Sequence, residues 1–416
     1  MRALLAFGGS RGDAQPGVLL ARELIGRGHE VTLAVSPNLV GFAAEYGVSA
    51  RPFGLDTDAL LRAQLQDRGR GGPRARLRAL RELNRQGFAE AAEDLLPLGD
   101  GVDVVVGAMA NEEVAEGVAA HARAAFAAMH YFPIRPNRSV PIVPAPYGRR
   151  LPGAMNRAGW RALGRARSWA LAPDVAELRG RAADPDCRRR IAIQAYDERL
   201  FGGLAAEWGV DHPFVGFLVP PLPSGRIDAR LSDWLADGDA PVYAGFGSMP
   251  VGDAQATIDL VHAACRRLGR RLLFVTGWNA VEPCLIEDLA VVRSVDHAAV
   301  LPRCAVAIHH GGAGTTAAAL RAGVPSVVCS FLADQPYWGQ RLQQLGVGAT
   351  LPFSRLTEAR LVRLLTRVTG EPVVGRSRAF AAEFRHDGVA RTADVVQLLG
   401  AGLRPAAPFV VDRSLL

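Results

Sequence analysis

Short apolar runs alternate along the chain with longer amphipathic stretches, and this alternation predicts parallel strands with helices on both faces of a sheet. A Gly-rich turn, GGSRGD, follows the first apolar run, and a helix is expected from about Ala14 to Gly28 with Pro16 in its first turn. The strands expected in the first half of the chain are 2–8, 30–35, 48–53, 102–107 and 124–129.

The segment GFLVPPLP at 216–223 separates this series from a second one. Its prolines exclude a helix interior or a central strand, so it is expected to be a linker. We therefore predict two doubly wound, Rossmann-like α/β domains, 1–216 and 217–416, which face each other across a cleft. The last helix is expected to return to the first domain. The strands expected after the linker are 241–247, 271–276, 290–295, 305–309 and 325–330.

The segment AVAIHHGGAGTT carries the strongest chemical signal. A buried strand is expected to end at His309, and an Ala-rich helix is expected to start near Thr315. The first N–H groups of a helix lack internal partners, and Gly311, Gly312 and Gly314 let a phosphate approach them without Cβ clashes. The alternative is a tight glycine turn capped by Thr315. Two adjacent histidines argue against it, because a packing turn does not need them.

Three further motifs follow predicted strands. GFGSM offers the Ser248 hydroxyl, although an ordinary strand–helix turn explains it equally well when taken alone. ADQPYWG offers Asp334 and Gln335, whose carboxylate and amide suit sugar hydroxyls; Asp334 also fits the N-cap of a helix. Asp13 in GGSRGD fits a general base, and it fits equally the N-cap of the helix expected at Ala14. Local sequence leaves these alternatives open.

Composition narrows the class of protein. The 416 residues carry a net charge of +7, and every basic residue is Arg; this modest excess does not imply nucleic-acid binding. The five cysteines form no metal-binding spacing and are expected to be reduced core residues. No signal peptide and no membrane span is expected, which favours a cytoplasmic protein.

The motifs GGSRGD, GFGSM, VDHAAVLPRC, HHGGAGTT and ADQP, in this order, resemble the family 1 glycosyltransferases of the GT-B fold. The likeness is greatest to actinobacterial enzymes that decorate antibiotic aglycones and mycobacterial glycopeptidolipids. It covers the second half of the chain and the first 50 residues. Segments 55–100 and 135–200, where such enzymes build their acceptor sites, match only in general layout.

The resemblance implies an inverting hexosyltransferase that moves a sugar from a UDP- or dTDP-activated donor to a hydroxyl of a natural-product or lipid-like acceptor. Asp13 matches the family's catalytic base. Ser10 stands on the acceptor side, where the plant branch has a histidine. Among the donor residues, His309 matches the diphosphate ligand, while Val295 and His297 stand where the base is held. The donor-binding residues implied are Ser248, Val295, His297, His309, Gly312, Gly314, Thr315, Asp334 and Gln335.

The resemblance implies neither a metal nor a cofactor. Three Asp-X-Asp spacings occur, of the kind that holds a divalent ion in GT-A enzymes, but all fall in apparent loops outside the phosphate turns. Chance occurrence explains them better. The three spacings are Asp56–Asp58, Asp184–Asp186 and Asp237–Asp239.

Three alternatives remain: a nucleotide-sugar epimerase of the same fold, a catalytically silent auxiliary protein, and a nucleic-acid binder that rests only on arginine content. Two basic segments also indicate a peripheral contact with a membrane. This interpretation ranks below that of a soluble small-molecule acceptor, because basic amphipathic stretches are common. One segment contains Arg68, Arg70, Arg74, Arg76, Arg78, Arg81 and Arg85; the other contains Arg149, Arg150, Arg157, Arg161, Arg165 and Arg167, with Trp160 and Trp169.

Overall fold

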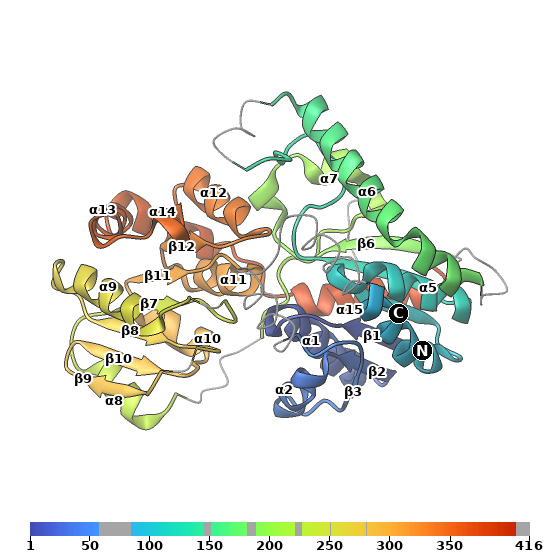
Figure 1. Cartoon of the computed structure of the whole chain (residues 1–416), viewed down its shortest axis with the longest axis horizontal. Coiled ribbons are helices and arrows are strands. Elements are labelled where there is room, and N and C mark those ends of the chain that lie inside the picture. Colours follow the sequence, from blue (N-terminus) through green and yellow to red (C-terminus); the bar gives the residue numbers. More distant parts are fainter. Residues whose placement is uncertain are drawn as a thin grey trace, which may run out of the picture. The chain divides into compact units, whose positions relative to one another are not determined.

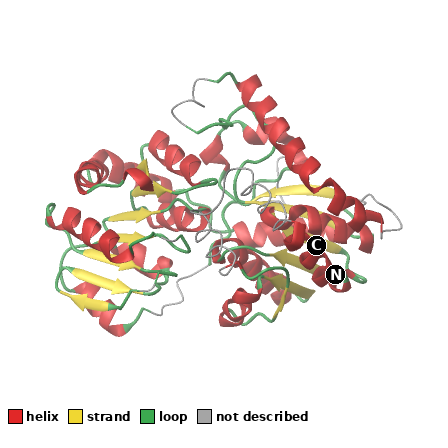
Figure 2. Cartoon of the chain, in the orientation of Figure 1, coloured by secondary structure: helices red, strands yellow, loops and turns green. Residues whose placement is uncertain are grey.

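The computed structural model forms two compact units (Figures 1 and 2). One comprises Met1–Ile142, Arg150–Leu218 and Asp387–Leu416, and the other Val143–Arg149 and Val219–His386. None of the described helices is long and apolar enough to cross a membrane. The residues that the structure describes are 1–57, 85–144, 151–180, 189–220, 227–249, 251–279 and 281–404.

The first unit contains a six-stranded sheet in the order β3-β2-β1-β4-β5-β6, in which every pairing is parallel. Helices α1 and α15 pack together on one face, and α5 and α6 pack together on the other side of the unit. The strands are β1 (Arg2–Phe7), β2 (Glu30–Val35), β3 (Ala50–Pro52), β4 (Val104–Ala108), β5 (Ala125–His130) and β6 (Arg190–Gln194). The helices are α1 (Arg11–Gly26), α2 (Val40–Glu45), α5 (Glu112–Ala122), α6 (Gly153–Gly180), α7 (Leu204–Trp208) and α15 (Gly388–Gly400).

The start of α1 differs from the prediction. The helix begins at Arg11 with Ser10 as its N-cap, so Asp13 is the third helical residue and not the cap. Pro16 accordingly lies inside the helix and not in its first turn. Because proline has no N–H group, the Gly12 carbonyl one turn earlier lacks an intrahelical donor. Strand β6 was not predicted, because its sequence RIAIQ follows an Arg-rich segment that masks the apolar run.

The second unit contains a seven-stranded sheet in the order β13-β12-β11-β7-β8-β10-β9, parallel except for the β9–β10 pair. The unpredicted strands β9 and β13 lie at its two edges. The strands are β7 (Val242–Gly245), β8 (Leu272–Val275), β9 (Cys284–Ile286), β10 (Leu289–Val292), β11 (Val306–His309), β12 (Ser326–Ser330) and β13 (Gly348–Pro352). The helices are α8 (Ala229–Ala236), α9 (Ala254–Arg266), α10 (His297–Val300), α11 (Ala313–Ala322), α12 (Gln335–Leu345), α13 (Glu358–Val368) and α14 (Glu371–Ala382).

Alternate side chains of these strands enter two apolar clusters, one on each face of the sheet. Ile308 of β11 joins the cluster that includes residues of α9 and α13, and Ala307 joins the cluster that includes residues of α8, α10 and α11. Three of the predicted core cysteines are buried, but Cys284 on the edge strand β9 is exposed. Cys187 lies outside the described residues.

Arg27, the C-cap of α1, fastens α15 to the first unit. Its Nη1 lies 2.5 Å from Asp394 Oδ1 and also donates to Gln397, and its Nη2 donates to the Ala390 carbonyl at 3.1 Å. The Asp394 side chain is only 4% exposed, so this carboxylate depends on the guanidinium for neutralisation. The distant C-terminal helix is thereby held on the first unit.

We predict that Arg27→Ala lowers the free energy of unfolding by about 1.5–3 kcal/mol, the usual cost of losing hydrogen bonds to a charged group. Chemical denaturation followed by circular dichroism measures it. Arg22→Ala, an exposed position on the same helix, is the control and should cost less than about 0.5 kcal/mol. Equal losses in the two variants would contradict this role of Arg27.

Candidate functional site

The turn after β11 leaves the sheet beside two other strand ends. β11 pairs with β7, with His309 opposite Gly245, and with β12, with His309 opposite Val328. Because these strands are parallel, the turns that follow them emerge at the same edge of the sheet. The predicted phosphate motif, the GFGSM turn and the segment before Asp334 therefore belong to one site in the second unit.

The N-terminus of α11 presents open backbone donors. Its N-cap is Gly312, which has no side chain to accept from the first N–H groups. Gly311 has φ +92°, a left-handed conformation that glycine adopts without strain. A Cβ at Gly314 would meet nothing within 4 Å, so packing alone does not demand glycine there. This arrangement suits an anion that approaches the amides of residues 313–315.

His309 lies at the end of β11, directly before the glycine turn. Its side chain is fully buried at the end of β11, and its Nδ1 accepts the Gly311 N–H at 3.1 Å. Burial, with His310 and His297 nearby, lowers its pKa to about 3, so the ring is neutral and carries its proton on Nε2. His309 therefore fixes the glycine turn through Nδ1, while its Nε2–H has no hydrogen-bond partner among the described residues.

His310, which sequence reasoning passed over, lies beside the same turn. The residue is partly exposed, and its ring lies close enough to Gly312 that a Cβ there would overlap Nε2. A Cβ at Gly247 would lie 3.1 Å from the same ring, so His310 stands beside both glycine turns. Burial lowers its pKa to about 4. His310 is therefore a further candidate for the diphosphate site, next to the predicted His309.

Three buried polar atoms near this turn have no hydrogen-bond partner among the described residues. They are His309 Nε2, His310 Nδ1 and the Thr316 hydroxyl in the first turns of α11. Buried polar atoms are nearly always paired in native proteins, by protein, water or ligand. Thr315, the predicted side-chain donor, is partly exposed in the same turn. The turn is thus a polar site whose hydrogen-bonding capacity exceeds what the fold uses.

The GFGSM turn is braced by the loop after β8. A Cβ at Gly277 would overlap the Gly247 carbonyl, so the two loops are in close contact. Asn279 reinforces this contact by donating to the carbonyls of Met249 and Thr276, at 3.3 and 3.0 Å. Ser248 is partly exposed on the braced turn, at the sheet edge where the diphosphate ligand is predicted.

Asp334 and Gln335 prove to be different kinds of residue. Gln335 is only 5% exposed; its Oε1 accepts from the N–H groups of Phe331 and Leu332, and its Nε2 lies 3.4 Å from Met249 Sδ. Its Oε1 therefore holds the loop, and the predicted sugar contact of Gln335 stays a prediction. Asp334 occupies the N-cap position of α12 but makes no capping hydrogen bond, and accepts instead from Trp338 Nε1 at 2.9 Å.

The residue before Asp334 is in an uncommon conformation. Ala333 has φ +57°, which costs a residue with a Cβ about 1 kcal/mol or more. This turn directs the chain from β12 into α12 and leaves the Asp334 carboxylate partly exposed. Of the predicted sugar-binding pair, Asp334 is the member whose geometry allows ligand contact.

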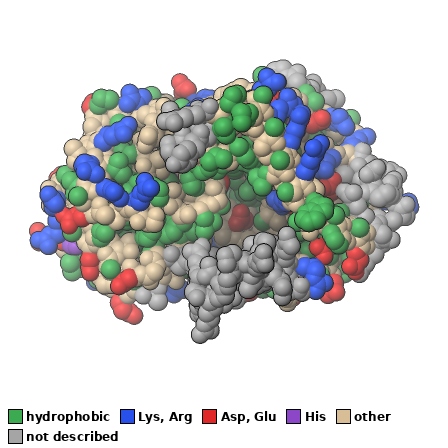
Figure 3. Space-filling model, turned by 45° about the horizontal axis from the view of Figure 1, so that its top comes forward, with side chains coloured by type: hydrophobic (Ala, Val, Ile, Leu, Met, Phe, Trp, Pro, Cys, Tyr) green, Lys and Arg blue, Asp and Glu red, His purple; other side chains and the backbone are tan. Residues whose placement is uncertain are grey.

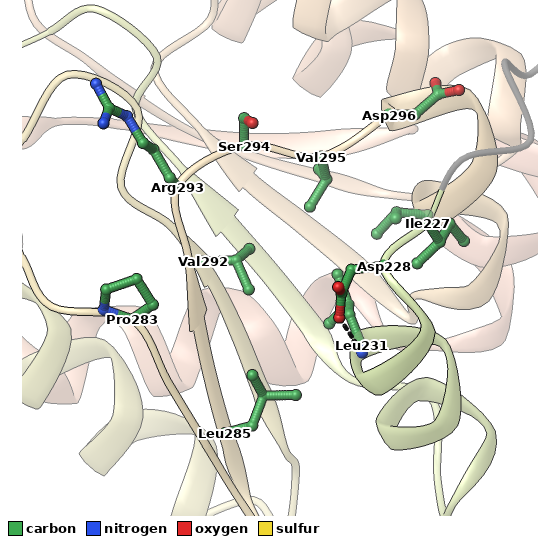
Figure 4. Close-up of a pocket in the computed structure, with 11 residues that line it drawn as sticks. Ile227, Asp228, Leu231, Pro283, Leu285, Val292, Arg293, Ser294, Val295 and Asp296 are labelled. Carbon is green, nitrogen blue, oxygen red and sulfur yellow. Dashed lines mark hydrogen bonds between the residues drawn. The ribbon is translucent and has the colours of Figure 1, made fainter.

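The loop after β10 borders a pocket of about 230 Å³ (Figure 4). Val295, predicted to lie near the base, is one of its walls, together with side chains from α8 and β9. His297 does not line the pocket; its Nε2 lies 2.8 Å from the buried Tyr243 hydroxyl, which fastens the loop to β7. The pocket is lined by Ile227, Asp228, Leu231, Pro283, Leu285, Val292, Arg293, Ser294, Val295, Asp296 and Val300.

In the first unit, Ser10 and Asp13 form a capping box. Asp13 Oδ2 accepts from both the Ser10 N–H and the Ser10 hydroxyl, each at 2.8 Å. Burial raises the pKa of Asp13, while the two Ser10 hydrogen bonds act in the opposite direction. No hydrogen bond to Oδ1 occurs among the described residues, which leaves that oxygen for a proton from another molecule.

Neighbouring groups hold this carboxylate in place. The Tyr131 hydroxyl, at the end of β5, donates to the Asp13 carbonyl at 3.0 Å, and Gly9 N–H donates to Ser36 Oγ at 2.9 Å. Gly9 has φ +130°, and a Cβ there would lie 2.6 Å from Asp13 Oδ2. The second glycine of GGSRGD is therefore required by the position of Asp13 itself.

The Asp237–Asp239 segment lies outside the glycine turns of the second unit, whereas Thr57, between Asp56 and Asp58, donates to the Gly9 carbonyl of the GGSRGD turn at 2.7 Å. Asp237 and Asp239 are exposed after α8, and Asp56 is exposed after β3. Asp58, Asp184 and Asp186 lie outside the described residues. Within the described part of the chain, no three His, Cys, Asp or Glu side chains gather as metal ligands would.

Comparison with known proteins identifies the class. Residues 3–112 match the glycosyltransferase family 28 N-terminal domain, and residues 284–401 match the erythromycin biosynthesis protein CIII-like C-terminal domain. An uncharacterized glycosyltransferase of Mycobacterium leprae is 36% identical over 92% of each chain. The O-mycaminosyltylonolide 6-deoxyallosyltransferase of Streptomyces fradiae is 32% identical over 92% of this chain and 94% of its own.

Solved structures agree on the fold. The calicheamicin glycosyltransferase CalG4 superposes with a TM-score of 0.69 at 18% identity, covering 98% of this chain and 99% of its own. The glycosyltransferase VinC, solved in complex with dTDP, gives 0.64 at 19% identity, covering 97% and 100%. In both comparisons the matched part of this chain includes both α/β units. The chain belongs to the GT-B glycosyltransferases and is related to those that act in antibiotic biosynthesis.

We predict that His310→Ala weakens thymidine diphosphate binding roughly 10- to 150-fold, because it removes a donor to a charged group worth about 1.5–3 kcal/mol. Gly314→Ala should also weaken binding without loss of stability, since its methyl group meets only open space in the fold. Calorimetric titration measures both, with the exposed His386→Ala as control. Unchanged affinity in both variants would contradict the proposed diphosphate site.

A second prediction concerns the pH dependence of transfer. The Ser10 hydroxyl favours ionised Asp13, so Ser10→Ala should raise the pKa of Asp13 and move the acid limb of kcat/KM to higher pH. Loss of the N-cap should cost about 1 kcal/mol of stability, which thermal unfolding checks separately. An acid limb that stays in place, or moves to lower pH, would show that Asp13 does not set it.

Proposed function

We propose that this glycosyltransferase is an inverting, metal-independent enzyme that moves a hexose from a UDP- or dTDP-activated donor. The acceptor is a hydroxyl group of a natural-product or lipid-like molecule. Asp13 takes the hydroxyl proton through Oδ1 as that oxygen attacks the anomeric carbon in a direct displacement. The second unit holds the donor and receives the departing diphosphate.

The observation that carries the proposal is the uncapped N-terminus of α11. Gly312 leaves the first amides of the helix open, and the helix dipole makes this end positive. Charge that develops on the leaving diphosphate would be stabilised by fixed donors, with His310 and Thr315 beside them. Such an arrangement supplies the electrostatic help that a divalent ion gives elsewhere, which supports metal independence and needs no cofactor.

The pocket behind the loop after β10 suits the base of the donor. Its walls include the apolar side chains of Ile227, Leu231 and Val295, and the loop backbone supplies polar groups for the edge of a planar ring. The dTDP complex of the structurally similar VinC supports a nucleotide diphosphate as ligand. Asp334 is the residue we assign to the sugar hydroxyls, with Gln335 as its support and Ser248 as a second diphosphate contact.

The alternatives are less well supported. Two relatives matched over 92% of this chain, from Mycobacterium leprae and Streptomyces fradiae, are named as transferases of sugars, which favours transfer over epimerisation. The Ser10–Asp13 capping box and the open α11 terminus are both intact, which argues against a catalytically silent auxiliary protein. The structure offers no observation that favours nucleic acid as a ligand.

The test is the Asp13→Asn variant. Asparagine can still accept from Ser10 but cannot take a proton, so transfer should fall at least about 100-fold. Affinity for thymidine or uridine diphosphate, measured by calorimetry, should stay within about twofold, because the donor residues are unchanged. Near-normal turnover in a correctly folded variant would rule out Asp13 as the base.

The same assay tests metal independence with the wild-type enzyme. Turnover in the presence of excess EDTA should match turnover with added magnesium. A strict requirement for a divalent ion would contradict this part of the proposal and return attention to the Asp-X-Asp segments.

A further inference from the structure

Helix α6 is exposed along most of its length. Its first turns are anchored by Trp160, which is 4% exposed and donates to the Val140 carbonyl at 2.9 Å, and its end is anchored by the buried Leu178. Between these anchors most residues are exposed, including Leu163 at 55% and Trp169 at 73%. Trp169 is the most exposed large apolar side chain among the described residues. A single exposed apolar side chain needs no explanation, but several that share one face of a helix point to an interaction partner.

The outward face of α6 is mostly apolar, with Arg165 as its charged member. At 100° per residue, the positions opposite the buried Trp160 and Leu178 form a stripe centred near Trp169. A soluble helix would carry charged residues there. The exposed members of this stripe are Met155, Ala158, Ala162, Ala166, Trp169, Pro173 and Ala176.

Arginine side chains border this stripe. Figure 3 shows basic side chains (blue) beside hydrophobic side chains (green) on the surface over α6. Arg161 and Arg165, one turn apart, are exposed and have no hydrogen-bond or ion-pair partner among the described residues. By contrast, Arg167 lies on the inner side and donates to the Met109 carbonyl at 3.0 Å and to Glu113. From Gly153 to Ala172 the helix contains no acidic residue.

We propose that this face of α6, which we call the α6 face, docks the enzyme on an anionic membrane surface. Apolar residues and tryptophan suit the boundary between headgroups and acyl chains, while unpaired guanidinium groups suit lipid phosphates. A second copy of the chain fits less well, because two such faces would bring like charges together. A nucleic-acid backbone would match the arginines but not the apolar stripe.

The first basic segment of the sequence, which includes Arg74, Arg76 and Arg78, lies outside the described residues and is not needed for this inference. Docking goes beyond the proposed transfer reaction, since the α6 face is separate from the residues assigned to the donor and to the base. Docking would bring a lipid-like acceptor within reach, yet its failure would leave the proposed transfer reaction untouched.

Co-sedimentation of the full chain with vesicles tests the proposal. Wild-type protein should bind vesicles that contain both phosphatidylglycerol and phosphatidylcholine. It should bind much more weakly to vesicles of phosphatidylcholine alone. Arg161→Glu with Arg165→Glu should weaken binding by roughly 30-fold or more, since each cation near the surface contributes about fivefold. Trp169→Ser should weaken it roughly tenfold through lost apolar burial.

A matched control is available on α13. Arg363 and Arg367 are exposed, one turn apart, and their reversal to Glu makes the same change in net charge. This control should bind within about twofold of wild type at physiological salt. Calorimetry of thymidine diphosphate binding should give the same affinity in every variant, which separates docking from donor binding.

Three outcomes would overturn the proposal. The first is that wild-type protein fails to bind anionic vesicles. The second is that the α13 control loses as much binding as the α6 variant, which would show a general effect of charge. Sedimentation velocity could instead show wild-type protein self-associating through Trp169, with the Trp169→Ser variant monomeric, which would assign the α6 face to a second copy.

Discussion

The N-terminus of α11 is the physical constraint on which the second unit depends. A helix start without a capping side chain leaves amides unsatisfied, and a protein keeps such a start only where something else satisfies them. Neighbouring parts of the unit hold this turn open. His309 takes the Gly311 N–H, Gly277 lets the loop after β8 brace the GFGSM turn, and Gln335 fixes the loop after β12.

In the first unit, the Asp13 carboxylate is likewise held in place by hydrogen bonds from neighbouring residues. Asp13 is held at one oxygen by Ser10, and its backbone is held by Tyr131, so the second oxygen keeps a fixed position. Burial that raises its pKa makes it a better proton acceptor, and the Ser10 hydrogen bonds keep the ionised form accessible. If Asp13 is the base and α11 binds the diphosphate, as we propose, then catalysis rests on fixed groups of the protein.

Sequence reasoning predicted the two α/β sheets well, because buried parallel strands leave unmistakable apolar runs. It missed β6, β9 and β13, whose runs are short, follow an Arg-rich segment or end in proline. The structure places the predicted donor turn at the end of β11 and shows what the sequence could not, namely that the His309 ring is enclosed by the sheet while His310 beside it is partly exposed. Two adjacent histidines look alike in sequence, because only the folded chain shows which ring is buried. The contacts of Gln335 could not be foreseen for a similar reason, since its partners are backbone groups.

Amide NMR of the deuterated, 15N-glycine-labelled enzyme tests the central claim most directly, with the Gly314 resonance assigned through the Gly314→Ala variant. If the diphosphate binds the open amides of α11, titration with thymidine diphosphate should shift the Gly312 and Gly314 resonances most strongly, with the midpoint found by calorimetry. Saturable binding that leaves these two resonances unmoved while other glycines shift would place the diphosphate elsewhere and contradict the claim.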